Sequence, residues 1–124
     1  PGATILTDET VNFIYNACDV GLNTCCGEGF GLTTLEHASL KKPQVVTDVP
    51  ALRETLRGAA YFVKPKIWSS MCRFDTHGGD IAHVDPKDFA IHLDRIYHNK
   101  DLRECNPSHI DMYSWSSVLK NLVL

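Results

Sequence analysis

Two glutamates separated by seven residues frame a glycine-rich segment, Gly27-Glu28-Gly29-Phe30-Gly31-Leu32-Thr33-Thr34-Leu35-Glu36. Ionised carboxylates only accept hydrogen bonds, so Glu28 and Glu36 suit the hydroxyl groups of a sugar or a ribose. Gly29 and Gly31 let the backbone approach a ligand closely. If a helix begins here, the amides of residues 31–33 have no intrahelical acceptor and favour an anion such as a diphosphate.

Each of these features also has an interpretation that needs no ligand. A glycine-rich turn between a strand and a helix serves packing in many α/β proteins. Glu28 can stabilise the helix dipole, and Glu36 can be a solvated residue on the helix surface. Spacing alone leaves both interpretations open.

The chemistry requires a strand before the segment and a helix after it. The short run Val20–Asn23 is a predicted strand, and a helix is predicted from about Gly31 to Lys41, before Pro43 ends it. The inward face of this helix is expected to carry Leu32, Leu35, Ala38 and Ser39. Ligand sites lie at such points, outside the carboxyl ends of parallel strands.

The remaining elements alternate between helix and strand. Thr7 is the predicted cap of a first helix, and Cys18 on its apolar stripe is expected to be buried. Asp85 is the predicted cap of a helix that begins at Pro86. Further strands are expected at 44–47 and 61–63, with helices at about 50–57 and from 114 onward. This succession predicts an α/β fold, a Rossmann-like parallel sheet with helices on both faces.

Residues 64–84 show no clear period and are predicted to form an inserted surface loop. Trp68 is expected to pack this loop against the domain, and contact with an acceptor is the alternative. The loop also contains the potential metal ligands Cys72, Asp75, His77, Asp80 and His83. Their spacing matches no known metal site, so no metal is expected.

Composition and charge narrow the class of protein. The chain has 124 residues, 44% hydrophobic and 22% charged, and a net charge of −3, which is ordinary for one globular domain. Lys and Arg form no run, so nucleic acid is not an expected partner. The first seven residues lack the basic region of a secretory signal. The five cysteines are odd in number and too sparse for a disulfide scaffold, so we expect a reducing compartment. They form no C-x-x-C pair, so neither a zinc ribbon nor a thioredoxin-type site is expected.

Residues 15–65 resemble the retaining glycosyltransferases of family 4, which have the GT-B fold. The matching pieces are Tyr15-Asn16-Ala17-Cys18-Asp19-Val20, the segment from Glu28 to Glu36, Pro43 to Asp48, and Leu52-Arg53-Glu54. A weaker match is Tyr113-Ser114-Trp115, at the start of the last helix. The two glutamates around Gly-Phe-Gly are the most specific part.

The resemblance implies a role for each residue of the segment. Glu28 is implied to be the catalytic residue that binds hydroxyls of the donor sugar, and Glu36 to hold the ribose. Gly29 allows close approach, the amides of Phe30 and Gly31 lie near the sugar, and those of Leu32 and Thr33 bind the diphosphate. The implied reaction is a retaining transfer of a hexose from a nucleotide-diphosphate sugar to an unknown sugar, lipid or protein acceptor, without a cofactor or metal.

The resemblance also bears on domain organisation. Residues 1–124 are expected to form one incomplete C-terminal Rossmann-like donor-binding domain with an insertion at about 64–84. In the family, a basic pair and the N-terminal Rossmann domain lie upstream, so this chain alone is expected to be inactive. A cytoplasmic location is expected, with attachment to a membrane surface through the N-terminal half as an option. The alternatives are a non-catalytic nucleotide-sugar-binding or interaction module and a GT-B-fold nucleotide-sugar epimerase.

The chain departs from the family pattern at three places, one of which is a pair of residues. Lys41 stands where the family usually has glycine, so a left-handed turn there costs about 1 kcal/mol, or the turn differs. His37 replaces a small residue and is expected to pack beside the site rather than act in catalysis. The pair Cys25-Cys26 replaces the usual Pro-Ser, which changes the expected shape of the donor loop.

Overall fold

A computed structural model describes residues 6–71 and 79–122 of the chain. The elements, in order, are α1 (Asp8–Ala17), β1 (Gly21–Asn23), α2 (Leu32–Ser39), β2 (Gln44–Thr47), α3 (Pro50–Thr55), β3 (Ala60–Val63), β4 (Ile67–Met71), β5 (Gly79–His83), α4 (Pro86–His98), η1 (Lys100–Leu102), η2 (Ile110–Tyr113) and α5 (Trp115–Leu122). No helix in this part of the chain has the length and apolar character needed to cross a membrane. The expectations for residues 1–5 and for Cys72, Asp75 and His77 lie outside the described residues.

A three-stranded parallel sheet forms the centre of the fold. Its order is β1-β2-β3, with Leu22 opposite Val45 and Val46 opposite Phe62. All four residues of β2 are buried, which is typical of a parallel strand covered on both faces. The α/β parallel sheet predicted from the alternating pattern is therefore confirmed.

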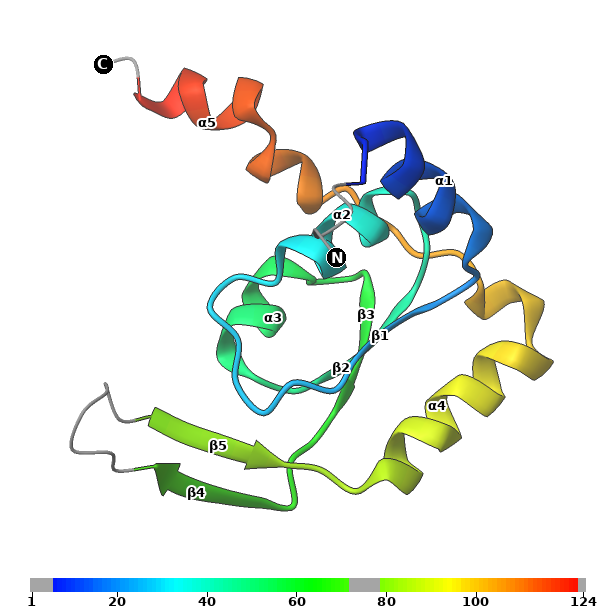
Figure 1. The fold of residues 1–124 in the computed structure, drawn as a ribbon, viewed down its shortest axis with the longest axis vertical. Helices are drawn as coiled ribbons and strands as arrows, with labels where there is room; N and C mark the ends of the chain where they lie inside the picture. The colour runs from blue at the N-terminus through cyan, green and yellow to red at the C-terminus, as the bar shows by residue number, and fades with distance from the viewer. Residues whose placement is uncertain (1–5, 72–78, 123–124) are drawn as a thin grey trace, which may run out of the picture.

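Helices cover the two faces of this sheet, as Figure 1 shows. Alternate residues of β2 point to opposite faces, and Val46 packs with Leu52 of α3 and Ala38 of α2. Val45 packs on the other face with Phe89 and Ile96 of α4. The first of these two clusters lies beneath the glycine-rich segment and fixes the start of α2.

The predicted helix caps are confirmed. The Thr7 side chain accepts a hydrogen bond from the Thr10 amide at the start of α1. At the start of α4, the Asp85 carboxylate accepts from the Lys87 amide, and Pro86 occupies the first helical position.

The region predicted as an irregular loop at 64–84 contains two paired strands. Strands β4 and β5 form an antiparallel ribbon that extends away from the sheet (Figure 1), with Trp68 opposite Ala82 and Ser70 opposite Asp80. The strands escaped prediction because serine, glycine and aspartate interrupt the apolar alternation that marks a half-buried strand. Side-chain hydrogen bonds support the pairing instead, from Ser70 to Asp80 and between Ser69 and His83.

Two burial predictions are wrong. Leu35 and Ala38 of α2 are buried as expected, but Leu32 and Ser39 are exposed, and Thr34 and His37 are buried in their place. Hydrogen bonds from Asn23 to Thr34 and from Gln44 to His37 turn this polar side of the helix inward. Cys18 is exposed, because α1 buries none of its residues against the rest of the described chain.

Candidate functional site

Gly31 joins the loop to α2 in a conformation that only glycine adopts easily. Its φ is 82°, in the left-handed region, and it is buried. A Cβ atom at this position would lie 2.5 Å from Cδ2 of Leu52, so α3 packs directly against the bare backbone. Gly29, the other glycine singled out in the segment, has space for a side chain, because a Cβ atom there would meet nothing within 4 Å.

The first turn of α2 offers backbone N–H groups. The helix begins at Leu32, and the first carbonyl to accept an intrahelical bond is that of Gly31, from the Leu35 amide at 2.9 Å. Gly31 has no side chain, and no side chain caps the helix. The amides of residues 32–34 therefore have no acceptor within the helix, as at any helix start, and face the loop. Such an end attracts anions.

Side-chain hydrogen bonds help to hold the loop between β1 and α2. The Asn23 side chain at the end of β1 accepts from the Cys25 amide and donates to the Thr34 hydroxyl, both at 3.0 Å. The buried Thr55 hydroxyl of α3 donates to the Phe30 carbonyl at 3.2 Å. The loop is thereby tied to a strand, to α2 and to α3.

Glu28 is exposed at the wall of a hollow in the surface. One of its carboxylate oxygens accepts a hydrogen bond from the Gly29 amide at 3.0 Å. The hollow has a volume of about 520 Å³ and is lined by Gly27, Glu28, Val49, Pro50, Ala51, Trp68 and Asp80. It thus lies where the loop, the start of α3 and the β4–β5 ribbon meet.

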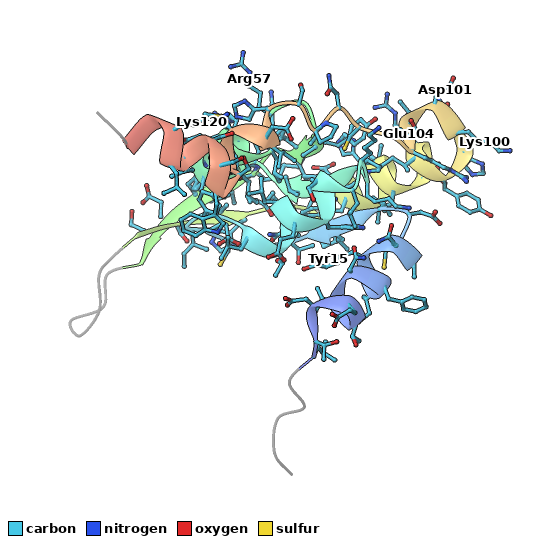
Figure 2. The ribbon with its side chains drawn as sticks, turned by 90° about the horizontal axis from the view of Figure 1, so that it is seen from above. Tyr15, Arg57, Lys100, Asp101, Glu104 and Lys120 are labelled. Carbon is cyan, nitrogen blue, oxygen red and sulfur yellow. The ribbon has the colours of Figure 1, made fainter. Side chains whose placement is uncertain are left out.

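Glu36 is exposed near the other end of α2. Its Oε2 atom accepts a hydrogen bond from the Tyr15 hydroxyl at 3.1 Å, and Figure 2 shows Tyr15 between α1 and α2. Partial burial raises the pKa of Tyr15, and the neighbouring Glu36 carboxylate raises it further. Together they border a smaller hollow of about 270 Å³, with Asp8 and Asn12 of α1. Glu28 and Glu36 therefore line two different hollows rather than one.

The other predicted residues surround the start of α2. Leu32 and Thr33 are exposed on its first turn, and the Phe30 ring stands edge-on to Tyr113 with centroids 5.4 Å apart. The sequence singled out Tyr15 as part of a motif but gave it no partner. Nothing in the sequence pattern linked Asp80 to Glu28. The two residues line the same hollow only because the β4–β5 ribbon lies beside the loop.

A family model described as "Glycosyl transferases group 1" matches residues 2–99, which include the loop, α2, the whole parallel sheet and the ribbon. The chain belongs to the group 1 glycosyltransferases. Members of such a group are transferases that act between a sugar donor and an acceptor. A comparison with curated proteins finds no significant match to the chain.

His37 has a structural role in this glycosyltransferase. Its ring is buried and stacks on Tyr15 with centroids 5.3 Å apart. The Gln44 amide nitrogen faces Nδ1 at 3.2 Å, so Nδ1 accepts, and Nε2 donates to the Tyr15 carbonyl at 3.1 Å. Both ring nitrogens are engaged within the protein, in agreement with the packing role expected from the sequence.

Lys41 adopts the left-handed conformation, which is the first of the two alternatives that the resemblance left open at this position. Its φ is 63°, and its carbonyl accepts a hydrogen bond from the Cys105 amide at 3.1 Å. The turn between α2 and β2 is therefore left-handed with a lysine in it.

A hollow larger than the two beside Glu28 and Glu36 contains none of the predicted site residues. It measures about 650 Å³ and is bordered by Arg53, Arg57, His109 and Tyr113, among others. Arg53 is already paired with the Asp48 carboxylate at 2.8 Å. Size alone therefore does not identify the site of this glycosyltransferase.

Proposed function

We propose that this group 1 glycosyltransferase chain binds a nucleotide-diphosphate sugar, in the manner of the retaining enzymes of family 4. Glu28 binds the sugar and contributes to catalysis, Gly29 lets the loop approach it, and the amides of residues 30–33 hold the sugar and the diphosphate. Glu36 binds the ribose. The donor is a hexosyl nucleotide, and the chain forms the later part of the C-terminal domain of a GT-B enzyme with an insertion at 64–84.

The conformation of Gly31 is the observation that carries this proposal. A glycine with positive φ, packed against Leu52, ends the loop and starts an uncapped helix at the carboxyl end of a parallel sheet. This arrangement brings backbone N–H groups to the place where ligands bind in such folds. In the transfer, these dipoles stabilise the negative charge that develops on the leaving diphosphate.

The two hollows suit an extended ligand. Glu28 precedes the first turn of α2, and Glu36 lies in the second turn. At 1.5 Å per residue, Glu36 is about 6 Å from Leu32 along the helix axis. A nucleotide sugar has the sugar at one end, the diphosphate in the middle and the ribose beyond it. Its parts can therefore meet Glu28, the helix start and Glu36 in turn.

Transfer also needs groups beyond those on the loop and α2. We propose that an N-terminal Rossmann domain of the same protein supplies the acceptor site and a basic pair for the diphosphate. The proposal includes no cofactor or metal, a cytoplasmic location, and no transfer by this chain alone.

Substitution of the two glutamates tests these roles. The variant Glu36→Ala should bind uridine, guanosine or adenosine diphosphate about ten- to a hundredfold more weakly, because a hydrogen bond to a charged group contributes roughly 1.5–3 kcal/mol. Glu28→Ala should bind the free diphosphate normally and lose only the extra affinity that the sugar contributes. Titration calorimetry with each diphosphate and its hexosyl derivative measures both effects.

The control is Glu104→Ala, an exposed glutamate that lines neither hollow and that Figure 2 shows apart from Tyr15. If Glu28→Ala weakens free nucleotide binding as much as Glu36→Ala does, the assigned roles are wrong. Binding of the sugar nucleotide without transfer, even in a protein with both domains, would favour a non-catalytic module. Inversion of the sugar's configuration without transfer would favour an epimerase.

A further inference from the structure

The β4–β5 ribbon is fixed against the glycine-rich loop. The Ala82 amide of β5 donates to the Cys26 carbonyl at 2.8 Å, and the Ala82 side chain is buried in the cluster beneath α2 and α3. At the base of the ribbon, the Lys66 amide donates a hydrogen bond to the His83 carbonyl at 2.7 Å. The ribbon is therefore part of the domain surface at the loop.

One face of this ribbon turns toward the loop. Residues that pair directly across an antiparallel ribbon lie on the same face, and side chains alternate along each strand. Trp68 is opposite Ala82, and Ser70 is opposite Asp80, so these four side chains share a face. Because Ala82 is buried against the domain, this is the face that the domain contacts.

Trp68 and Asp80 border the hollow that contains Glu28. Trp68 leaves 48% of its surface exposed, although tryptophan has a large apolar area to bury. Asp80 is held by the Ser70 hydroxyl, which donates to Oδ1 at 2.8 Å and leaves Oδ2 able to accept another donor. The hollow therefore combines an open aromatic ring with carboxylates from two separate segments.

This combination matches the chemistry of a pyranose. A hexopyranose has a flat, weakly polar face of C–H groups and a rim of hydroxyl groups. The C–H face suits the electron-rich face of an aromatic ring, and the hydroxyls suit carboxylate acceptors. A nucleoside diphosphate has no such rim of hydroxyls around an apolar face, and the phosphates would be repelled by the two carboxylates.

We propose that the β4–β5 ribbon is a wall of the sugar site, with Trp68 stacking on a hexopyranose ring and Asp80 accepting its hydroxyls opposite Glu28. The inference rests on the proposed function, because Glu28 defines the same hollow. It adds two residues outside the glycine-rich segment that select the sugar. The pyranose is either the donor's hexose or that of a saccharide acceptor, and the test distinguishes them.

The test compares substitutions of the two tryptophans of the chain. Trp68→Leu retains an apolar side chain to pack the ribbon but removes the aromatic face, and Trp68→Phe keeps a smaller aromatic face. Trp115→Leu is the matched control, since Trp115 is 80% exposed on α5 and lines none of the hollows near Glu28 or Glu36. Calorimetry measures binding of UDP-glucose, GDP-mannose, UDP and GDP. Saturation-transfer NMR measures binding of methyl glucoside and methyl mannoside in the presence of the diphosphate.

Trp68→Leu should weaken binding of a hexose-containing ligand about five- to tenfold, the size of an aromatic contact, and leave UDP and GDP binding unchanged. Trp68→Phe should restore most of the loss, and Trp115→Leu should have no effect. A loss confined to the nucleotide sugars assigns the pyranose to the donor, and one confined to the methyl glycosides assigns it to the acceptor. Asp80→Asn should lower the same affinities.

Two outcomes would overturn the inference. In the first, Trp68→Leu binds every hexose-containing ligand as the unsubstituted protein does. In the second, it weakens UDP and GDP as much as their sugar derivatives, which would mean that Trp68 only supports the fold of the loop. In both cases the binding of UDP or GDP by the unsubstituted protein still upholds the proposed function. Failure of the unsubstituted protein to bind any nucleotide or nucleotide sugar would refute both.

Discussion

Lys41 holds a backbone conformation that disfavours any side chain. Its φ of 63° makes it the one non-glycine residue with a positive φ in the part of the chain that the structure describes. The turn follows α2 and leads into β2, and the Cys105 amide bonds to the Lys41 carbonyl. The strain is therefore retained because neighbouring segments fix the turn from both sides.

We expect Lys41→Gly to stabilise the fold. Relief of left-handed strain, offset by the greater freedom of glycine in the unfolded chain, should raise the free energy of unfolding by roughly 0.5–1 kcal/mol. Lys42→Gly is the control, because Lys42 does not have a positive φ and the substitution should only destabilise. Urea denaturation measures both. A Lys41→Gly variant no more stable than the unsubstituted protein would show that the turn relaxes.

Single residues differ in how far the sequence predicts them. The glycine pattern located Gly31, and the resemblance to family 4 gave the strained turn at Lys41 as one of two alternatives, since both depend on local backbone geometry. The sequence predicted a packing role for His37, but its burial in place of Ser39 could not be predicted in the same way. It depends on Gln44 and on Gly21, where a Cβ atom would collide with the Gln44 side chain.

At the scale of elements, α3 supports the glycine-rich loop. The single proton of the Thr55 hydroxyl is shared between two carbonyls, that of Ala51 within α3 and that of Phe30 in the loop. Leu52 of the same helix packs on Gly31. This short helix thus determines where the first turn of α2 lies.

We expect Thr55→Val to loosen this support. Valine has the shape of threonine without the hydroxyl, so the substitution should lower the free energy of unfolding by about 1 kcal/mol and weaken nucleoside diphosphate binding a few-fold. Thr55→Ser keeps the hydroxyl and should bind normally. Urea denaturation and calorimetry test this pair. Equal binding by both variants would mean that the loop keeps its position without α3.

Elements were predicted best where one local signal defines them. The caps of α1 and α4 and the run of β2 are contained in a few adjacent residues. The ribbon was not predicted, because no apolar pattern marks its strands. A side-chain bond from Ser70 to Asp80 supports their pairing, and a backbone bond from Ala82 to Cys26 joins β5 to the loop. The sequence therefore could not predict that Trp68 and Asp80 of the ribbon lie beside Glu28.

At the scale of the molecule, the parallel sheet brings together the segments that form the candidate site. Strands β1, β2 and β3 run in the same direction, so the loop before α2, the start of α3 and the path to the ribbon leave the sheet at one end. This is why Glu28, Pro50 and Trp68 border one hollow although they are far apart in the sequence. The alternating pattern predicted the sheet, and the sheet explains the meeting of these segments.

The central claim is that the first turn of α2 binds a diphosphate through its amides. Leu32 occupies the first helical position and is exposed, and Pro50 and Pro86 occupy the same position in α3 and α4. Val49 and Asp85 before those prolines are extended, whereas Gly31 is left-handed, so Leu32→Pro also requires Gly31 to become extended, which glycine permits. Leu32→Pro removes one amide proton while the helix remains, and Leu32→Ala removes the side chain but keeps the amide. Circular dichroism checks that both variants fold alike.

The decisive measurement is calorimetric binding of the preferred nucleoside diphosphate to these two variants. Because the lost hydrogen bond is to a charged group, Leu32→Pro should bind about ten- to a hundredfold more weakly than Leu32→Ala, which should bind like the unsubstituted protein. Equal affinities in the two folded variants would contradict the account, since the start of α2 would then take no part in binding the diphosphate.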